Sequence, residues 1–337
     1  MFRDGTPLRT EDRINFVLSH GALGDMISSL PAVVWARKHQ PAELKMAVWV
    51  AEYQVDLVTK LVGGPGLEVL PLSKWNEMCK AGAGEYAGAN VVNYAIKNTV
   101  TRNRFDMVDY SFATLLDRQP WGNNERNYPH TAPLGPRTLD ERYAVIPVGA
   151  TNPLSTFHAK VMGPFLHWLL GQGIRPVLTG KRGRTNVVMM QKGQAMPLVI
   201  HDKVNDLDAN LLAQCLDLRD KTDLVGLRDL CGYAEVVAGI DGGTLHLAGT
   251  TEAPIVYACT RVDPLHRSIT RNDEVNWNLI HVVPRELECA GCQSHWTLMF
   301  GHDFATCAYG DAKCTELLHP DDFIQAADIL LRENQAL

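Results

Sequence analysis

Short apolar runs alternate with helical stretches along almost the entire chain of 337 residues, and this alternation constrains the fold more than any other feature. The runs RINFVLSH (13–20), KMAVWVAE (45–52) and VVAGID (236–241) are typical of buried strands, whereas DLVGLRDLCGYAEV (223–236) has helical spacing. Strands that alternate with helices predict a parallel sheet, because two parallel strands need a crossover connection between them.

The alternation weakens between residues 101 and 142, and within this region a stretch rich in proline, glycine and asparagine (118–142) predicts a loop. A second alternating series starts with the strand-like RYAVIPVGA (142–150). We therefore predict an α/β fold with two Rossmann-like domains, residues 1–145 and 146–318, that face each other across a cleft. The amphipathic stretch 319–337 is expected to form a closing helix that packs back toward the first domain. Ligands of such sheets bind beyond the carboxyl ends of the strands, so the loops that follow strands are the candidate sites.

The composition excludes some classes of function. The apolar fraction is 46%, the charged fraction 21% and the net charge −6, which is ordinary for a globular protein and argues against general binding to nucleic acid or anionic membranes. No run approaches the roughly 20 apolar residues of a membrane span. The N-terminal MFRDGTPLRTEDR is polar and lacks the apolar core of a signal peptide. We expect a cytoplasmic location.

The first candidate loop is SHGALGDMISSLP (19–31), directly after the first predicted strand. Gly21 and Gly24 allow a tight turn and a close approach to a ligand. Asp25 then stands at the start of the next helix, where it either caps the helix or serves as a general base at the mouth of the cleft. The spacing matches neither the dinucleotide fingerprint nor a P-loop, which disfavours an oxidoreductase and an NTPase.

The second candidate is GIDGGTLHLAG (239–249), where an acid, two glycines, a threonine and a histidine stand between a strand and a helix. Bare glycine amides at a helix start are typical of an anion site, most often for phosphate, and a threonine hydroxyl adds a donor. The alternative is a simple connection between strand and helix. The candidate residues of this junction are Asp241, Gly242, Gly243, Thr244 and His246.

Two further loops follow predicted strands of the second series. PVGATNPLSTFHAK (147–160) places Thr151 and other hydroxyl groups before a helix, and Lys160 is either a surface lysine or a point charge for a phosphate. TGKRGRTN (179–186) is a glycine-rich basic loop, suited either to a position beside a nucleotide or to a solvated turn.

Eight cysteines divide into two groups. We expect buried free thiols at four scattered positions, Cys79, Cys215, Cys231 and Cys259. The other four form the pattern C-x2-C-x14-C-x6-C, with His295 and His302 nearby as alternative ligands. These late thiols either chelate a structural zinc or iron, remain unbridged, or form disulfides, which a cytoplasmic location disfavours. The cluster consists of Cys289, Cys292, Cys307 and Cys314.

Three segments together resemble the heptosyltransferase-like glycosyltransferases of family 9, which have the GT-B fold. GDMISSLPAVVWARK (24–38) is similar to the family's opening G-D-x-x-x-x-x-P-A segment, and VIPVGATN…HAK (145–160) to its inter-domain strand and phosphate-binding lysine region. Residues 223–267 resemble its block of helix, strand, D-[ST]-G-x-x-H and strand. Gly242 departs from that motif, which usually has Ser or Thr there. The stretch 101–142, where the acceptor would bind, has no match.

The resemblance implies an inverting transfer with no cofactor or metal for chemistry, in which Asp25 removes the proton of an acceptor hydroxyl. A helix start, Gly243, Thr244, Lys160 and Thr151 would receive the leaving diphosphate. Asp241 would hold the sugar or orient the loop, and His246 would reach toward phosphate. The implied donor is a nucleotide sugar, typically ADP-heptose. Protein-directed members of the family carry four cysteine ligands for iron, which adds to the structural zinc or iron expected at the cysteine cluster.

The implied acceptor is lipopolysaccharide core or a protein hydroxyl, with contact to a membrane surface and oligomer formation both compatible with the sequence. Three alternatives stay open. One is a nucleotide-sugar-binding protein without catalysis. Another is a phage-type glycosyltransferase that acts on a modified nucleic-acid base, which the net charge disfavours. The last is a two-domain epimerase or dehydrogenase, of which the dehydrogenase is disfavoured by the missing fingerprint.

Overall fold

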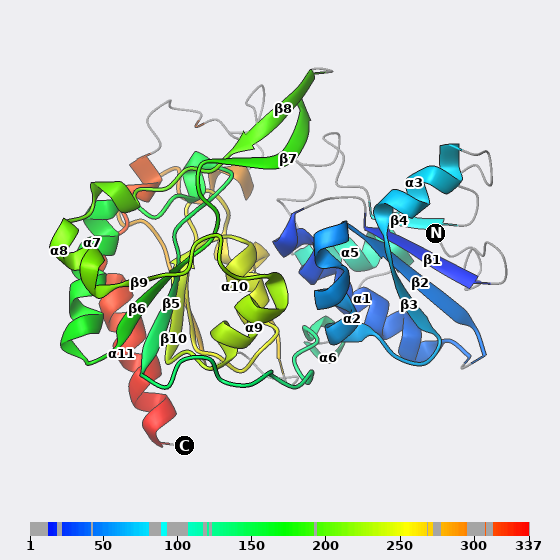
Figure 1. Cartoon of the computed structure of the whole chain (residues 1–337), viewed down its shortest axis with the longest axis horizontal. Coiled ribbons are helices and arrows are strands. Elements are labelled where there is room, and N and C mark those ends of the chain that lie inside the picture. The colour runs from blue at the N-terminus through cyan, green and yellow to red at the C-terminus, as the bar shows by residue number, and fades with distance from the viewer. Residues whose placement is uncertain are drawn as a thin grey trace. The chain divides into compact units, whose positions relative to one another are not determined.

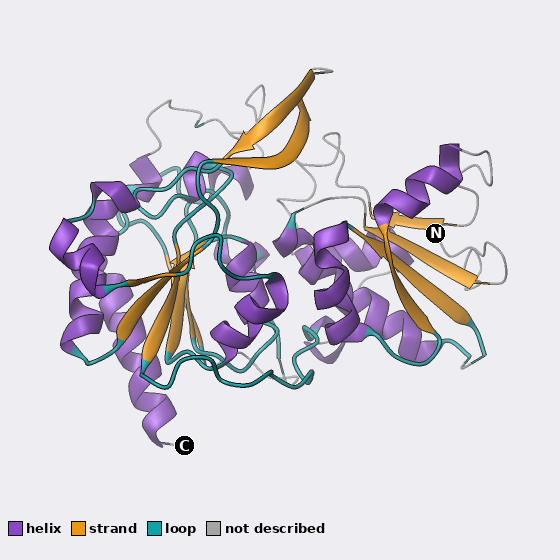
Figure 2. Cartoon of the chain, viewed as in Figure 1, coloured by secondary structure: helices purple, strands orange, loops and turns teal. Residues whose placement is uncertain are grey.

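The chain forms two compact units in a computed structural model. The model describes residues 13–18, 22–41, 43–80, 89–92, 107–116, 120, 123–191, 194–267, 269–271, 278–294, 307 and 313–336. As far as they are described, unit 1 comprises Met1–Leu134, Gly249–Thr251 and Leu265–Asn276, and unit 2 comprises Gly135–Ala248, Glu252–Pro264 and Trp277–Leu337. Each unit has its own parallel sheet with helices packed against it (Figure 2).

Unit 1 is built on four parallel strands in the order β3-β2-β1-β4. The strands are β1 (Arg13–Leu18), β2 (Lys45–Val50), β3 (Leu67–Pro71) and β4 (Ala89–Val92). Nearly every described side chain of β1 and β2 is buried, as expected for parallel strands that are covered on both faces. From β1 the chain adds β2 and β3 on one side and then β4 on the other, so the strand order reverses between β1 and β4.

The helices of unit 1 are α1 (Leu23–His39), α2 (Val55–Val62), α3 (Leu72–Lys80), α5 (Met107–Leu116) and α6 (Asn123–Arg126). The first of them, α1, runs through Pro31 without ending there. It packs against α5, where Ser29 Oγ and Ser111 Oγ lie 3.2 Å apart in a buried contact. The α5 helix ends before residues 118–142, for which the sequence predicts a loop, whereas the short α6 lies inside that stretch, so the loop prediction was wrong for residues 123–126.

Unit 2 is built on six parallel strands in the order β12-β11-β10-β5-β6-β9. They are β5 (Tyr143–Pro147), β6 (Arg175–Thr179), β9 (Leu216–Asp217), β10 (Val236–Ile240), β11 (Ile255–Ala258) and β12 (Leu279–Val282). The chain extends from β5 toward β6 and β9, and then from β10 toward β11 and β12 on the other side. The order therefore reverses between β5 and β10.

Helices cover both faces of this second sheet (Figure 1). They are α7 (Ala159–Gly171), α8 (Ala209–Gln214), α9 (Leu224–Gly232), α10 (Gly243–Ala248) and α11 (Pro320–Ala336). On one face, α9 and α10 lie together, and on the other are α7, α8 and α11. Phe323 of α11 is fully buried and stacks on Phe157, with ring centroids 4.9 Å apart. The apolar face of the last helix is thus used inside unit 2.

An antiparallel hairpin of β7 (Arg184–Gln191) and β8 (Gln194–Val199) extends away from the second sheet (Figure 1). A hydrogen bond from Ile200 N to Gly183 O, 2.7 Å long, closes its base. The alternating pattern of the sequence did not predict this hairpin. It gave no sign of β7, because nothing in local periodicity distinguishes a hairpin inserted between two sheet strands.

The predicted α/β, GT-B fold class is confirmed by the two parallel sheets and by the structural comparisons reported below. Within the described residues, no helix is both long enough and apolar enough to span a membrane.

Candidate functional site

Three of the four loops selected from the sequence follow the strands at which each sheet reverses its order. In unit 1 the loop after β1 leads to Asp25, and in unit 2 the loops after β5 and β10 carry the remaining candidates. Because β5 and β10 are hydrogen-bonded neighbours, their carboxyl ends open beside each other. Such a reversal point is where open α/β sheets bind ligands.

Asp241 begins the loop after β10, and its carboxylate is the centre of a buried polar network. Tyr257 of the adjacent strand β11 donates its hydroxyl proton to Asp241 Oδ1 over 2.6 Å. The same hydroxyl lies 3.0 Å from His246 Nε2, which is 3.8 Å from Asp241 Oδ1. Tyr257 has a single proton, so the contact with His246 requires Nε2–H to donate to the tyrosine oxygen. The network thereby assigns the proton-bearing nitrogen of the ring.

The two glycines and the threonine of this loop are half-buried, in contrast to Asp241 and His246, which are 6% and 2% exposed. Gly242 O accepts from Leu245 N over 3.1 Å as α10 begins at Gly243. The loop backbone is therefore accessible while its two ionisable side chains are enclosed. In this arrangement the His246 ring faces Tyr257, and its predicted reach toward phosphate stays a prediction.

The loop after β5 carries Thr151 and leads to Lys160 in the first turn of α7, and both residues are exposed. His158 caps α7 by accepting a 3.3 Å hydrogen bond at Nδ1 from Lys160 N. Glu316 lies close to both, with carboxylate oxygens 3.7 Å from His158 Nε2 and 3.9 Å from Lys160 Nζ. In the same loop, Thr156 Oγ1 is buried without a hydrogen-bond partner among the described atoms, an arrangement that costs about 1–3 kcal/mol unless a ligand or water completes it.

Asp25 lies in the first turn of α1 and is half-buried. The N-cap of this helix is Ala22, without a side-chain capping bond, so Asp25 is not the capping residue that the sequence allowed. Its backbone oxygen accepts hydrogen bonds from the hydroxyls of Ser28 and Ser29, both 2.9 Å long. Asp25 belongs to unit 1, and its approach to the loops of unit 2 stays a prediction.

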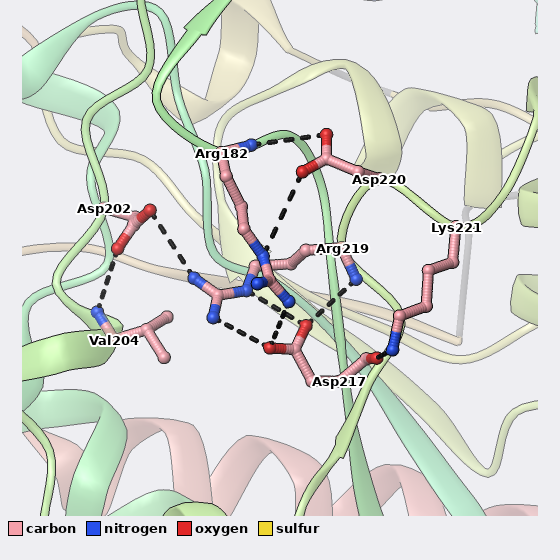
Figure 3. Close-up of polar contacts among 7 residues, drawn as sticks. All are labelled: Arg182, Asp202, Val204, Asp217, Arg219, Asp220 and Lys221. Atoms are coloured by element: carbon pink, nitrogen blue, oxygen red, sulfur yellow. Dashed lines mark hydrogen bonds and ion pairs between the residues drawn. The ribbon is translucent and has the colours of Figure 1, made fainter.

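The basic loop after β6 contributes to a charged cluster with the segment after β9 (Figure 3). Asp217 accepts hydrogen bonds from Arg219 (2.8 Å) and from Arg182 (2.6 Å). Hydrogen bonds from Arg219 are the largest cause that holds the pKa of Asp217 well below its ordinary value. Lys181 and Arg182 also face Asp220 at 3.8 and 4.0 Å. The cations of this loop are therefore held by carboxylates at the same edge of the sheet.

Two residues that sequence reasoning left out complete the site, Tyr257 and Arg261. Both lie in the block 223–267 that resembles family 9, but neither was singled out as a candidate. Arg261 is 8% exposed, and its Nε donates to Ser155 Oγ over 3.1 Å. A polar residue within a fully buried strand, such as the tyrosine of IVYA, was the available signal for the first. No local signal marked the second.

The described late cysteines form no disulfide, so that alternative is wrong for them. Burial raises the pKa of the Cys314 thiol to about 12, and Cys292, Cys307 and Cys289 raise it as well, which indicates that the four lie near one another. Within the described part of the chain, however, no group of three or more His, Cys, Asp or Glu side chains is arranged to hold a metal ion. The metal site stays a prediction. Cys215, Cys231 and Cys259 are buried and form no disulfide, as predicted, and the Cys79 side chain lies outside the described residues.

No family model and no curated protein matches this sequence. Solved structures do match the fold. TibC, an iron-containing dodecameric glycosyltransferase from enterotoxigenic E. coli, superposes with a TM-score of 0.70 at 16% identity over 99% of this chain and 82% of its own. E. coli ADP-heptose lipopolysaccharide heptosyltransferase II superposes with a TM-score of 0.63 at 12% identity, over 96% of this chain and 99% of its own.

A third structure, the family 9 glycosyl transferase from Veillonella parvula, superposes with a TM-score of 0.63 at 14% identity over 97% of this chain and 100% of its own. At such identities the likeness concerns the fold, and at that level the resemblance to heptosyltransferase-like family 9 is confirmed. TibC has also been solved with ADP-D-β-D-heptose, and E. coli heptosyltransferase WaaC with ADP.

Proposed function

We propose that the protein is a glycosyltransferase that moves a sugar from a nucleotide diphosphate donor to an acceptor hydroxyl. The observation that carries the proposal is the buried network of Asp241, Tyr257 and His246 beside an accessible glycine loop, at the reversal point of a fold shared with heptosyltransferases. ADP-heptose is the proposed donor, because TibC and WaaC have been solved with ADP-heptose and ADP. Lipopolysaccharide core or a protein hydroxyl is the proposed acceptor.

The proposed reaction is an inverting displacement at the anomeric carbon. The Asp25 carboxylate accepts the proton of the acceptor hydroxyl, and that oxygen forms a bond to the anomeric carbon as the bond from this carbon to the phosphate oxygen breaks. The bonding electrons leave with the nucleotide diphosphate. Positive charge on Lys160, the Thr151 hydroxyl and the amides of Gly243 and Thr244 would stabilise the negative charge that develops on it. The scheme needs no catalytic metal.

Nucleotide binding is tested first, by thermal shift with ADP-, UDP-, GDP- and CDP-sugars. A ligand present at about 100 times its Kd stabilises the folded state by roughly 2.7 kcal/mol, so the true donor should raise Tm by several degrees. A panel without any shift would remove the donor site and with it the proposal.

The role of Asp25 is tested by Asp25→Ala. Because the residue is proposed to act on the acceptor, we expect transfer to fall by about 10²–10⁴-fold while the nucleotide-induced thermal shift is retained. Asp56→Ala is the matched control, since Asp56 also stands in the first turn of a helix in unit 1. Equal transfer by wild type and Asp25→Ala would exclude Asp25 as the base. A chain that binds the donor but never transfers the sugar would be a binding protein instead.

We also propose that the four late cysteines hold a structural zinc or iron, as TibC is iron-containing. No chemical step is assigned to this metal. Metal analysis of the purified chain should find about one ion per chain, and Cys292→Ser should lose it without losing the nucleotide thermal shift. A metal-free, fully stable wild type with four titratable thiols would contradict this.

A further inference from the structure

Arg261 connects three loops at the carboxyl edge of the second sheet. It lies in the segment after β11, and its Nε donates to Ser155 Oγ in the loop after β5. Its terminal nitrogen Nη2 lies 3.8 Å from Asp241 Oδ2 in the loop after β10. The guanidinium is nearly enclosed, with a side chain 9% exposed against 6% for Asp241. A cation thus lies between the two loops that the proposed donor would occupy.

Holding the loops together does not by itself require this charge. The neighbouring Thr260 already joins the segment after β11 to the loop after β5, because its hydroxyl donates to Leu154 O over 2.7 Å. Enclosing an arginine is costly, and an apolar side chain of similar volume often serves packing equally well. The planar fork of donors and the fixed charge are what an apolar residue could not supply.

The guanidinium of Arg261 supplies a second partner that restricts the orientation of the Asp241 carboxylate. Oδ1 accepts from Tyr257 within β11, whereas Oδ2 faces Arg261 in the segment that follows β11, so the two oxygens have different partners. Ser155 in turn fixes the plane of the guanidinium through Nε. Rotation of the carboxylate would require both partners to move, which leaves its orientation toward the loop opening determined.

We propose that Arg261 is a positioning residue for Asp241, and that it acts on recognition of the donor's sugar and not of its nucleotide. This inference rests on the proposed function and on the sugar-holding role that the family resemblance implies for Asp241. A misaligned Asp241 should therefore weaken binding of a nucleotide sugar while free nucleotide, which lacks the sugar, binds as before. A residue with a merely structural role would weaken both.

The test measures, by calorimetry, the Kd of ADP and of ADP-heptose, or of whichever nucleotide and nucleotide sugar the wild type binds best in the panel. For Arg261→Met we expect a Kd for the nucleotide sugar at least 10-fold higher, and a Kd for the free nucleotide within 2-fold of wild type. Arg261→Lys retains the charge but loses the planar guanidinium. Its Kd for the nucleotide sugar should rise by at least about one third of the factor seen for Arg261→Met, with the Kd for the free nucleotide again unchanged.

Ser155→Ala keeps the inference testable if Arg261→Met does not fold, since it removes only the acceptor of Nε. For this variant we expect a Kd for the nucleotide sugar that is 3- to 10-fold higher than in wild type, and an unchanged Kd for the free nucleotide. Equal loss of both ligands, or no loss in any of the three variants, would overturn the positioning role. If the wild type binds no nucleotide sugar, both the proposed function and this inference fail. If the wild type binds it and the variants bind it equally well, only the inference fails.

Discussion

Replacing Tyr257 with phenylalanine should destabilise unit 2 more than an ordinary buried tyrosine replacement, because its hydroxyl serves a carboxylate. The side chain is fully buried, and its oxygen bridges Asp241 Oδ1 at 2.6 Å and His246 Nε2 at 3.0 Å. Without it, the remaining atoms are 3.8 Å apart, too far to bond directly. A hydrogen bond to a charged group contributes about 1.5–3 kcal/mol, so we expect a loss of about 2 kcal/mol and a Tm lower by about 4–8 °C.

Tyr143→Phe is the matched control for this prediction. Tyr143 is also fully buried, but its hydroxyl donates to a neutral acceptor, the backbone oxygen of Leu230, over 2.8 Å. Its loss should cost about 1 kcal/mol. Equilibrium urea unfolding, followed by tryptophan fluorescence, gives both free energies on one scale. If Tyr257→Phe costs no more than Tyr143→Phe, the reasoning that Asp241 depends on this donor is refuted.

Two further predictions concern stability. The arginine partners of Asp217 hold its pKa in the folded protein below the unfolded-state pKa of about 4. The ionised carboxylate therefore stabilises the fold above that pH, and this contribution is lost as the pH falls below it. Asp217→Asn should thus be less stable than wild type at pH 7, with the gap in urea midpoint narrowing from about pH 5 to 3. Asp140→Asn is the control for the loss of one exposed carboxylate. A stability gap between Asp217→Asn and wild type that widens in acid would contradict the sign. Phe323→Ala should cost about 3–5 kcal/mol, since the ring is fully buried on Phe157. Ile329→Ala, on the same helix but 40% exposed, should cost under about 1 kcal/mol in the same unfolding assay.

Periodicity anticipated the elements that pack through their own apolar pattern. The strands of both sheets that carry buried runs, such as β1, β2, β5 and β10, were predicted within a few residues, and so was α11. The two-residue strand β9, the short α8 and the hairpin were missed. Each is too short, or too dependent on its neighbours, for its own sequence to fix its conformation.

The site shows the same division. Asp241 and His246 were found because they stand in a recognisable junction after a buried strand. Tyr257 and Arg261 lie 16 and 20 positions beyond Asp241, and only strand pairing and loop packing bring them to its carboxylate. Residues that are distant along the chain leave no shared spacing for a reader of the sequence to find.

The amino-acid sequence by itself determined that this protein has two parallel α/β sheets and which loops follow their strands, because strand and helix periods are local properties of the chain. The tertiary structure decided the strand order, and with it the pairs β1–β4 and β5–β10 at which each sheet reverses. It also decided which polar groups are enclosed together, because burial and hydrogen bonding depend on contacts among segments that no local pattern encodes.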